Sequence, residues 1–546
     1  MSMTDMDLDA LVIGAGFAGL AMQYRLREQG LSSRIVERGD GVGGTWYWNR
    51  YPGARCDIES VDYCYSFAPE LLDEWQWSER FATQPEILSY LEFAAQRLDL
   101  MRDIDFGTTV TATQFIDGHW DVFVADEVRY RARFLIMATG NLSEPKPVDI
   151  AGFDTFEGEV YRTSSWPKEG VDLTGLRVGV IGTGSTGIQA IPLIARQATE
   201  LTVFQRTPNY SMPAHNRPLS DDYRAQVRAT FVARREMARN SDGGVPFPAT
   251  RTAAFDIGEQ ERQRRYWQGW RRGGINALSH AFTDYFSNES ANKTAQDFAR
   301  DRIREIVHDP QTAEALCPVH HIGTKRTCVD TNYYQTYNLP HVRLIDLRRE
   351  PLVSVDPQGV QTSLRHVELD VLVLALGFDA MTGALLAIDI QGRQGRRLAQ
   401  EWSDGPHTYL GLMTAGFPNL FMITGPQSPG VLSNMVVSIE QHVELIGKLL
   451  NHVKDRGYGC VEPQEEAQRH WVAYVNELAD QTLYPQSKSW YTGVNVEGKP
   501  RVFLPYVNGC GNYRRECREI IDDGWRGFRF SGASERTERV SDGSNK

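Results

Sequence analysis

Six residues near the N-terminus, Gly14-Ala15-Gly16-Phe17-Ala18-Gly19, have the spacing of a loop that binds the pyrophosphate of a dinucleotide. The apolar run DALVIG precedes the loop, an amphipathic stretch follows it, and Glu37 ends the next apolar run. Glycines allow a tight turn and close approach of a pyrophosphate, while an acid at the second strand end binds ribose hydroxyls. We therefore expect Gly14, Gly16, Phe17, Gly19 and Glu37 to bind one dinucleotide, with a purely structural glycine turn as the alternative.

A second loop, Gly182-Thr183-Gly184-Ser185-Thr186-Gly187, lies in the same context, but its second strand ends in VFQRT. Gln205 and Arg206 therefore replace the acid. An acid would repel a 2′-phosphate, whereas an arginine binds it through two hydrogen bonds. This loop predicts NADP, unless Arg206 is an ordinary surface residue. The two sites together indicate a flavin in the first loop and NADPH in the second, with hydride passing from nicotinamide to flavin.

The reduced flavin has two possible uses, a disulfide or dioxygen. Electron transfer to a disulfide needs a close cysteine pair, but seven residues separate Cys56 from Cys64. Reaction with dioxygen instead needs a site that excludes water and holds a peroxide anion. We therefore favour dioxygen as the electron acceptor.

A longer stretch, GGTWYWNRYPGARCD (43–57), matches position by position a motif of the type I Baeyer–Villiger monooxygenases. FEGEVYRTSSWP (156–167) resembles the second motif of that family, with Arg162 in place of its histidine. GTKR (323–326), GFPNLF (416–421), SNMVVSIEQHVE (433–444) and SWYTGVN (489–495) follow in the family's order. The chain is therefore identified as a member of this family, and it is similar in pattern to the phenylacetone and steroid monooxygenase branch.

The resemblance implies oxidation of aromatic, cyclic or bulky ketones to esters or lactones, with FAD, NADPH and dioxygen. It implies that Arg326 holds a peroxyflavin anion and the oxyanion of the ketone adduct without giving up a proton, because a guanidinium stays charged in proteins. Asp57 would hold that arginine in place. The resemblance further implies cofactor contacts from Thr45, Trp46, Arg55, Tyr63, Gln189, Thr207, Lys325 and Trp490, and a substrate pocket lined by Gly430, Val431 and Leu432.

Two alternatives stay open beside this interpretation. One is a flavin monooxygenase that oxidises sulfides or amines, and the other is a non-catalytic NADP-binding relative. Arg162 favours the second alternative, because arginine accepts no hydrogen bond and does not titrate near neutral pH as histidine does. We instead expect FEGEVYRTSSWP to be a linker between the nucleotide domains, where Arg162 changes coupling or rate but not the product.

These residues require an α/β fold with two Rossmann-like dinucleotide-binding domains, the second nested in the first, and a helical insertion. The apolar runs RFLIMATGN (133–141) and ELDVLVLALGFD (368–379) predict further parallel strands that end at a nucleotide cleft. The region from about 215 to 320 predicts helices. The expected bounds are 1–144 and 379–546 for the FAD-binding domain, 145–213 and 322–378 for the NADP-binding domain, and 214–321 for the insertion, with a disordered C-terminal tail.

The composition of the 546 residues is that of an ordinary globular protein, with a net charge of −12. An acidic chain argues against nucleic acid as a partner. We find no basic N-terminal region and no apolar run long enough to cross a membrane, which predicts a cytoplasmic protein. Seven scattered cysteines and the His320-His321 pair predict neither disulfides nor a metal site. The sequence does not determine the oligomeric state, and a monomer is compatible with it.

Overall fold

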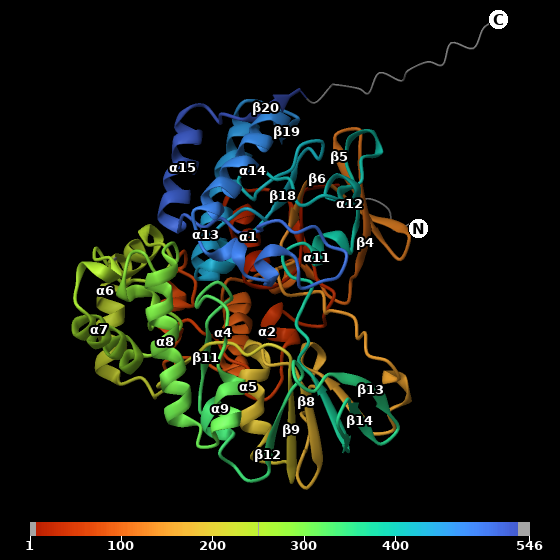
Figure 1. Ribbon diagram of the computed structural model, residues 1–546. Helices are drawn as coiled ribbons and strands as arrows, with labels where there is room; N and C mark the ends of the chain where they lie inside the picture. The colour runs from red at the N-terminus through yellow and green to blue at the C-terminus, as the bar shows by residue number, and fades with distance from the viewer. Residues whose placement is uncertain (1–6, 249, 533–546) are drawn as a thin grey trace, which may run out of the picture.

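The first nucleotide-binding sheet is mixed and contains the first glycine loop. The computed structural model describes residues 7–248 and 250–532, so most of the predicted disordered tail lies outside the described residues (Figure 1). The strands run in the order β17-β4-β5-β6-β1-β2-β3, and β18 pairs with β6. The bounds are β1 Asp7–Ile13, β2 Ser33–Val36, β3 Ile104–Asp105, β4 Val110–Ile116, β5 His119–Val124, β6 Glu127–Met137, β17 Asp389–Gln391 and β18 Leu420–Met422.

The second nucleotide-binding sheet is wholly parallel and contains the second glycine loop. Its order is β12-β9-β8-β16-β7. Its central strands β8 and β16 are buried on both faces, by helix α5 (Ser185–Ile194) on one side and by the small sheet of β13 to β15 (residues 352–368) on the other, which is why the runs VGVI and VLVL are continuously apolar. The bounds are β7 Glu159–Arg162, β8 Arg177–Ile181, β9 Glu200–Gln205, β12 Val342–Asp346 and β16 Val371–Leu374.

The second sheet is nested in the first, as the sequence predicted. All of its strands lie in the chain between β6 and β17, and the chain then returns to add β17 and β18 to the first sheet. Figure 1 shows the first sheet and helix α13 (Met435–Asp455) above the second sheet, with the helical insertion at one side. The exact domain boundaries stay predictions.

The helical insertion consists of α6 to α9, between the second-sheet strands β9 and β12. Its helices begin at residues suited to that position, because Ser220 accepts a hydrogen bond from the backbone of Tyr223 and Asn288 accepts from two backbone N–H groups. Together they confirm the helices that the sequence predicts for the region from about 215 to 320. The bounds are α6 Asp221–Asn240, α7 Glu259–Arg272, α8 Glu289–Ile306 and α9 Pro310–Leu316.

The other elements connect or cover the two sheets. The helices are α1 Phe17–Glu28, α2 Thr45–Trp48, α3 Pro69–Glu74, α4 Gln84–Arg97, α5 Ser185–Ile194, α10 Tyr333–Thr336, α11 Gly383–Leu386, α12 Leu398–Glu401, α14 Glu465–Asp480 and α15 Cys510–Asp522. Three small sheets pair β10 Ser211–Pro213 with β11 Cys328–Asp330, join β13 Leu352–Asp356, β14 Gly359–Thr362 and β15 His366–Glu368, and pair β19 Cys460–Pro463 with β20 Phe528–Ser531.

The FEGEVYRTSSWP segment differs from the expectation of a linker. Its residues Glu159–Arg162 form β7, the edge strand of the second sheet, where Arg162 pairs in register with Leu374. Trp166 is buried and its ring lies 5.4 Å from that of Tyr161. Four of the twelve residues of the segment are therefore part of the second sheet, as its edge strand. Its single glycine and its proline suggested only a turn.

Candidate active site

Arg326 and Asp57 form a two-bond ion pair in the structure. Arg326 Nε donates to Asp57 Oδ2 at 2.6 Å and Nη2 donates to Oδ1 at 2.7 Å. Burial opposes the charge on the guanidinium, but Asp57 outweighs it and raises the pKa of Arg326 above its ordinary value. Arg326 is therefore a permanent cation in a fixed orientation.

The Arg326 guanidinium also reaches the predicted substrate pocket. Its Nη1 donates to the carbonyl of Val431 at 2.8 Å, within the short helix η8 (Gly430–Leu432). Asp57 and Val431 thus use three of the five N–H groups of the guanidinium. The hydroxyl of Tyr491 is close enough for the Arg326 charge to act on it, although burial still raises the pKa of Tyr491 to about 12. Because 22% of the Arg326 side chain stays exposed, the cation retains donor capacity for a ligand.

The first glycine loop fits a bound dinucleotide. A Cβ on Gly19 would lie 1.8 Å from the carbonyl oxygen of Gly14, and a Cβ on Gly14 would lie 2.6 Å from that of Ala138. These glycines therefore let α1 begin directly above the strand ends, where its N-terminus favours a phosphate. The carboxylate of Glu37 accepts from the backbone of Ala15 at 2.8 Å, which holds the acid beside the loop.

The predicted flavin-contact residues pack next to this loop. Gly43 donates a backbone hydrogen bond to Ala15, so that α2, with Thr45 and Trp46, begins against the glycine loop. Trp46 Nε1 donates to the hydroxyl of Tyr63 at 3.2 Å. The ring of Phe17 lies 5.1 Å from that of Tyr63. The structure thus brings Phe17, Trp46 and Tyr63 into contact beside the loop, and Thr45 precedes Trp46 on α2.

The second glycine loop repeats the geometry of the first. A Cβ on Gly187 would lie 2.1 Å from the carbonyl oxygen of Gly182, and a Cβ on Gly182 would lie 2.4 Å from that of Ala375. Helix α5 begins at Ser185, after Gly184. Thr183 Oγ1 donates to the carbonyl of Thr207 at 3.1 Å, which fixes the loop to the strand end that carries Arg206.

Arg206 and Lys325 lie near one another at this second loop. The charge of Arg206, together with burial as the larger cause, lowers the pKa of Lys325. Within residues 7–248 and 250–532, neither cation forms an ion pair with a carboxylate. Two adjacent unpaired cations at a strand end fit an anion such as a 2′-phosphate.

The residues between Tyr51 and Asp57 connect the two nucleotide sites. Gln189, on α5, accepts from the Tyr51 hydroxyl at 2.8 Å and donates to the carbonyl of Arg55 at 3.1 Å. Burial raises the pKa of Tyr51 to about 12, although a hydrogen bond with Thr186 acts to lower it. The guanidinium of Arg55 donates to Glu79 and Phe81. Arg55 therefore holds its own segment, and its predicted cofactor contact stays a prediction.

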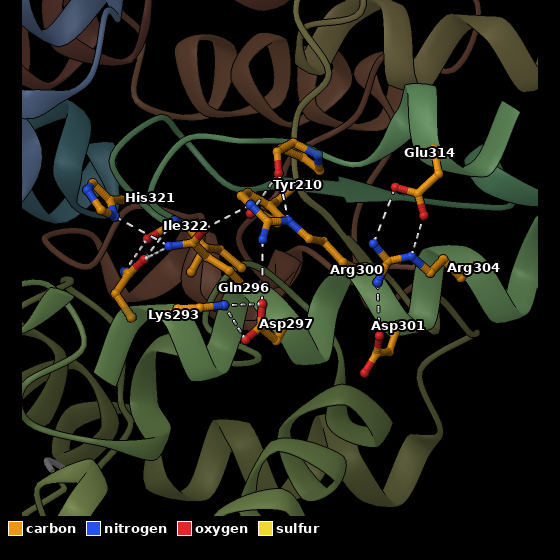
Figure 2. Close-up of polar contacts among 12 residues, drawn as sticks. Tyr210, Lys293, Gln296, Asp297, Arg300, Asp301, Arg304, Glu314, His321 and Ile322 are labelled. Atoms are coloured by element: carbon orange, nitrogen blue, oxygen red, sulfur yellow. Dashed lines mark hydrogen bonds and ion pairs between the residues drawn. The ribbon is translucent and has the colours of Figure 1, made fainter. Parts of the chain in front are cut away.

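A polar network on α8 supports the loop that precedes Lys325 and Arg326 (Figure 2). Asn292 Oδ1 accepts from the backbone of Ile322 at 3.1 Å, and Gln296 Nε2 lies 3.3 Å from His321 Nδ1. The other ring nitrogen of His321, Nε2, lies 2.9 Å from Gln486 Oε1. His321 therefore joins the helical insertion to the segment that leads to Trp490.

The segment around Trp490 closes the site from the C-terminal part of the chain. Trp490 begins the short helix η10 (Trp490–Thr492), and its ring lies 4.3 Å from that of Tyr491. Thr324 and Ser487 form a hydrogen bond between their hydroxyls, so this segment is held against the loop of Arg326. The predicted NADP contact of Trp490 stays a prediction.

The sequence predicts no disulfides, no metal site and no membrane-spanning helix. All seven cysteines are buried and free. Among the described residues, no group of three or more His, Cys, Asp or Glu side chains could hold a metal ion. His320 is largely buried, which together with the nearby Lys325 charge lowers its pKa to about 3. No helix of residues 7–248 and 250–532 combines the length and apolar character needed to cross a membrane.

Sequence reasoning missed two kinds of functional residue. Tyr491 directly follows the predicted Trp490, and a second aromatic in SWYTGVN was the available signal. Gln296 and Gln486 carry no local signal, because their role depends on His321 lying between them.

The comparisons with known proteins agree with this arrangement. The family described as pyridine nucleotide-disulphide oxidoreductase matches residues 11–241. A Baeyer–Villiger monooxygenase from Pseudooceanicola batsensis is 40% identical and covers 95% of each chain. An oxidised steroid monooxygenase bound to NADP is 47% identical, with a TM-score of 0.92 over 96% of this chain and 100% of its own. A solved complex of OTEMO with FAD and NADP is 39% identical, with a TM-score of 0.93 over 96% and 99% of the two chains.

Proposed function

The chain belongs to the Baeyer–Villiger monooxygenases, and from this premise we propose that it converts ketones into esters or lactones at Arg326. The reaction consumes one ketone, one dioxygen, one NADPH and one proton, and it yields one ester, one NADP⁺ and one water. The observation that carries the proposal is the Arg326–Asp57 pair, which also contacts the carbonyl of Val431.

The cofactors of this family are FAD and NADPH, and the two glycine loops are their proposed sites. FAD would lie on the loop from Gly14 to Gly19, with Glu37 at its ribose, and NADPH would lie on the loop from Gly182 to Gly187. When bound, FAD takes two electrons from NADPH and delivers them to dioxygen. Arg206, Thr207 and Lys325 would bind the 2′-phosphate of NADPH.

Arg326 would stabilise negative charge as it develops on the oxygen of the ketone. A guanidinium offers hydrogen bonds but keeps its proton, so it stabilises an oxyanion without protonating the reactive oxygen species. Asp57 would hold the planar guanidinium in one orientation through two hydrogen bonds. Preorganised donors of this type contribute a factor of about 10² to 10³ in kcat.

The pocket next to Arg326 favours an apolar ketone. Val431, Tyr484, Tyr491, Phe503 and Leu504 form one buried apolar cluster, and Leu432 packs against it. An aromatic, cyclic or bulky ketone would bury its hydrocarbon part there while its oxygen faces the cation. The free cysteines fit a reducing compartment, so we place the protein in the cytoplasm.

The experiment is a product analysis with the purified FAD-loaded protein. Phenylacetone, a set of cyclic ketones, a steroid ketone and an aryl sulfide are each supplied with NADPH and air. We expect ester or lactone in proportion to the NADPH consumed for at least one ketone, at a higher rate than sulfoxide. Hydrogen peroxide as the only product with every ketone would contradict the proposal. Faster turnover of the sulfide than of every ketone would favour heteroatom oxidation instead.

A further inference from the structure

Lys146 lies in the connection between the two sheets, and neither glycine loop includes it. Its backbone N–H donates to the carbonyl of Gly377 at 3.2 Å, and the preceding Pro145 forms an isolated bridge with Phe378. Lys146 is therefore fastened to the residues that directly follow β16, at the carboxyl edge of the second sheet.

Three neighbouring strands bring their ends together at this edge. The order β9-β8-β16 places the end that carries Arg206, the start of the second glycine loop and Gly377 side by side. The close approach of Gly182 to Ala375 shows that the second glycine loop contacts the first residue after β16. Ligands of open parallel sheets bind outside these carboxyl ends. Lys146 is thus anchored at the edge where the second dinucleotide is proposed to bind.

The positive charge of Arg206 near Lys146 is only partly offset, because the nearby carboxylate of Asp379 also pairs with Lys499. Burial, and after it the charge of Arg206, lowers the pKa of Lys146, just as Arg206 lowers that of Lys325. Arg206 therefore has two lysines near it, Lys146 and Lys325, and both are partly buried. A guanidinium that has an ammonium group near it on each of two segments favours binding of an anion.

The ammonium group of Lys146 has donors to spare. Its Nζ donates to the carbonyl of Asn495 at 3.1 Å, and this is one of three N–H groups. Asn495 is itself held by a hydrogen bond from its Nδ2 to the carbonyl of Phe378 at 2.8 Å. The contact with Asn495 thus fixes the position of the lysine and leaves two donors for a ligand.

We propose that Lys146 is a third cationic contact for the 2′-phosphate of NADPH and helps to discriminate it from NADH. The inference rests on the proposed function, because it takes Arg206 and Lys325 as the other two contacts. A phosphate with two negative charges accepts several hydrogen bonds at once, so three cations on one edge suit it better than the single acceptors of an unphosphorylated ribose.

The test measures equilibrium binding of 2′,5′-ADP and of 5′-AMP to the FAD-loaded protein, without ketone or turnover. The variants are Lys146→Met, Lys146→Arg and Arg206→Met. Lys448→Met is the control, because Lys448 pairs with Glu444 on exposed α13 surface. We expect Lys146→Met to weaken 2′,5′-ADP about tenfold, which is the usual effect of one hydrogen bond to a charged group. Binding of 5′-AMP should not change, and Lys146→Arg should restore most of the loss.

Three outcomes would overturn the inference. If Lys146→Met weakens both nucleotides equally, the lysine only holds the Asn495 segment in place. If Lys146→Met has no effect while Arg206→Met weakens 2′,5′-ADP, the phosphate site is correct but Lys146 is outside it. If neither variant has an effect, the proposed 2′-phosphate site fails and the Lys146 contact fails with it. None of these results depends on whether a ketone is oxidised.

Discussion

Arg326 and Asp57, which are 269 positions apart in the chain, meet through two parallel hydrogen bonds. Asp57 ends the first family motif and Arg326 ends GTKR, so the pair joins two parts of the chain that each contact a glycine loop. Val431 then connects the same guanidinium to the buried apolar cluster that contains Tyr484 and Phe503. One cation thus has contacts with the regions proposed for both cofactors and for the substrate.

Arg326→Met should lower the rate of ester formation by at least about 100-fold, because it removes a fixed donor to the developing oxyanion. NADPH oxidation should continue and yield hydrogen peroxide. The measurement is ester and peroxide formed per NADPH consumed. Arg348→Met is the matched control, since that arginine pairs with Asp346 at the surface. An unchanged ester yield in Arg326→Met would remove Arg326 from the chemistry.

Gly19→Ala and Gly187→Ala should separate the two nucleotides. The added methyl groups would overlap the carbonyl oxygens of Gly14 and Gly182, which forces the helix away from the strand end. We expect Gly19→Ala to lose FAD. Gly187→Ala should keep FAD but bind NADPH at least tenfold more weakly, which is an affinity loss on the order of one hydrogen bond to a charged group. Flavin absorbance and NADPH titration measure these effects. Gly258→Ala is the control, because a Cβ at that position meets nothing within 4 Å. Loss of FAD in Gly187→Ala and weaker NADPH binding in Gly19→Ala would show that the two loops are assigned wrongly.

His321→Ala should loosen the segment that carries Trp490 and Tyr491. The change removes the link between Gln296 and Gln486, so amide hydrogen exchange should rise at residues 486–492. The share of NADPH that ends in ester should fall, since the segment lies against the Arg326 loop. His308→Ala provides the comparison, because that exposed histidine contacts Asn338 only through its backbone N–H. Equal exchange in both variants would refute the role of the link.

His442 should make the fold sensitive to acid. Burial lowers its pKa from 6.5 to about 4. Its Nδ1 accepts from the backbone of Thr424, and its Nε2 pairs with the Tyr513 hydroxyl. Below pH 6.5 the unfolded chain takes up a proton that the folded chain refuses until about pH 4, so the unfolding free energy falls in this range by about 1.4 kcal/mol per pH unit.

The measurement for His442 is urea unfolding at a series of pH values. His442→Gln should have a shallower slope than the parent chain between pH 6.5 and pH 4, whatever its absolute stability. His119→Gln, at an exposed position, should keep the parent slope. A parent chain and a His442→Gln variant with the same slope would show that His442 is not the titrating group.

The two glycine loops and the strands beside them could be predicted from the sequence because their signals are local. Each loop needs a strand, three glycines and a helix in immediate succession, and the parallel pairing of the strands on either side of each loop confirms that pattern. The family motifs likewise predicted that Asp57 and Arg326 would act together. FEGEVYRTSSWP was the exception, since an edge strand of four residues has too few positions to show its period.

The contacts that depend on long-range packing could not be predicted in the same way. Lys146 reaches the second sheet edge only because the connection folds back onto Gly377. Likewise, the side chain of Arg55 turns to Glu79 although its motif suggested a cofactor contact. Side-chain direction in such segments follows from neighbours far away in the sequence, which residue types and spacing do not encode.

The most direct test of the central claim is the fate of the oxygen atoms. The FAD-loaded protein is supplied with NADPH, a ketone that it turns over and dioxygen labelled with the heavy oxygen isotope, and the ester is analysed by mass spectrometry. The account predicts one labelled oxygen atom per ester and one NADPH consumed for each. Unlabelled ester, or NADPH consumption that yields only labelled hydrogen peroxide, would contradict it.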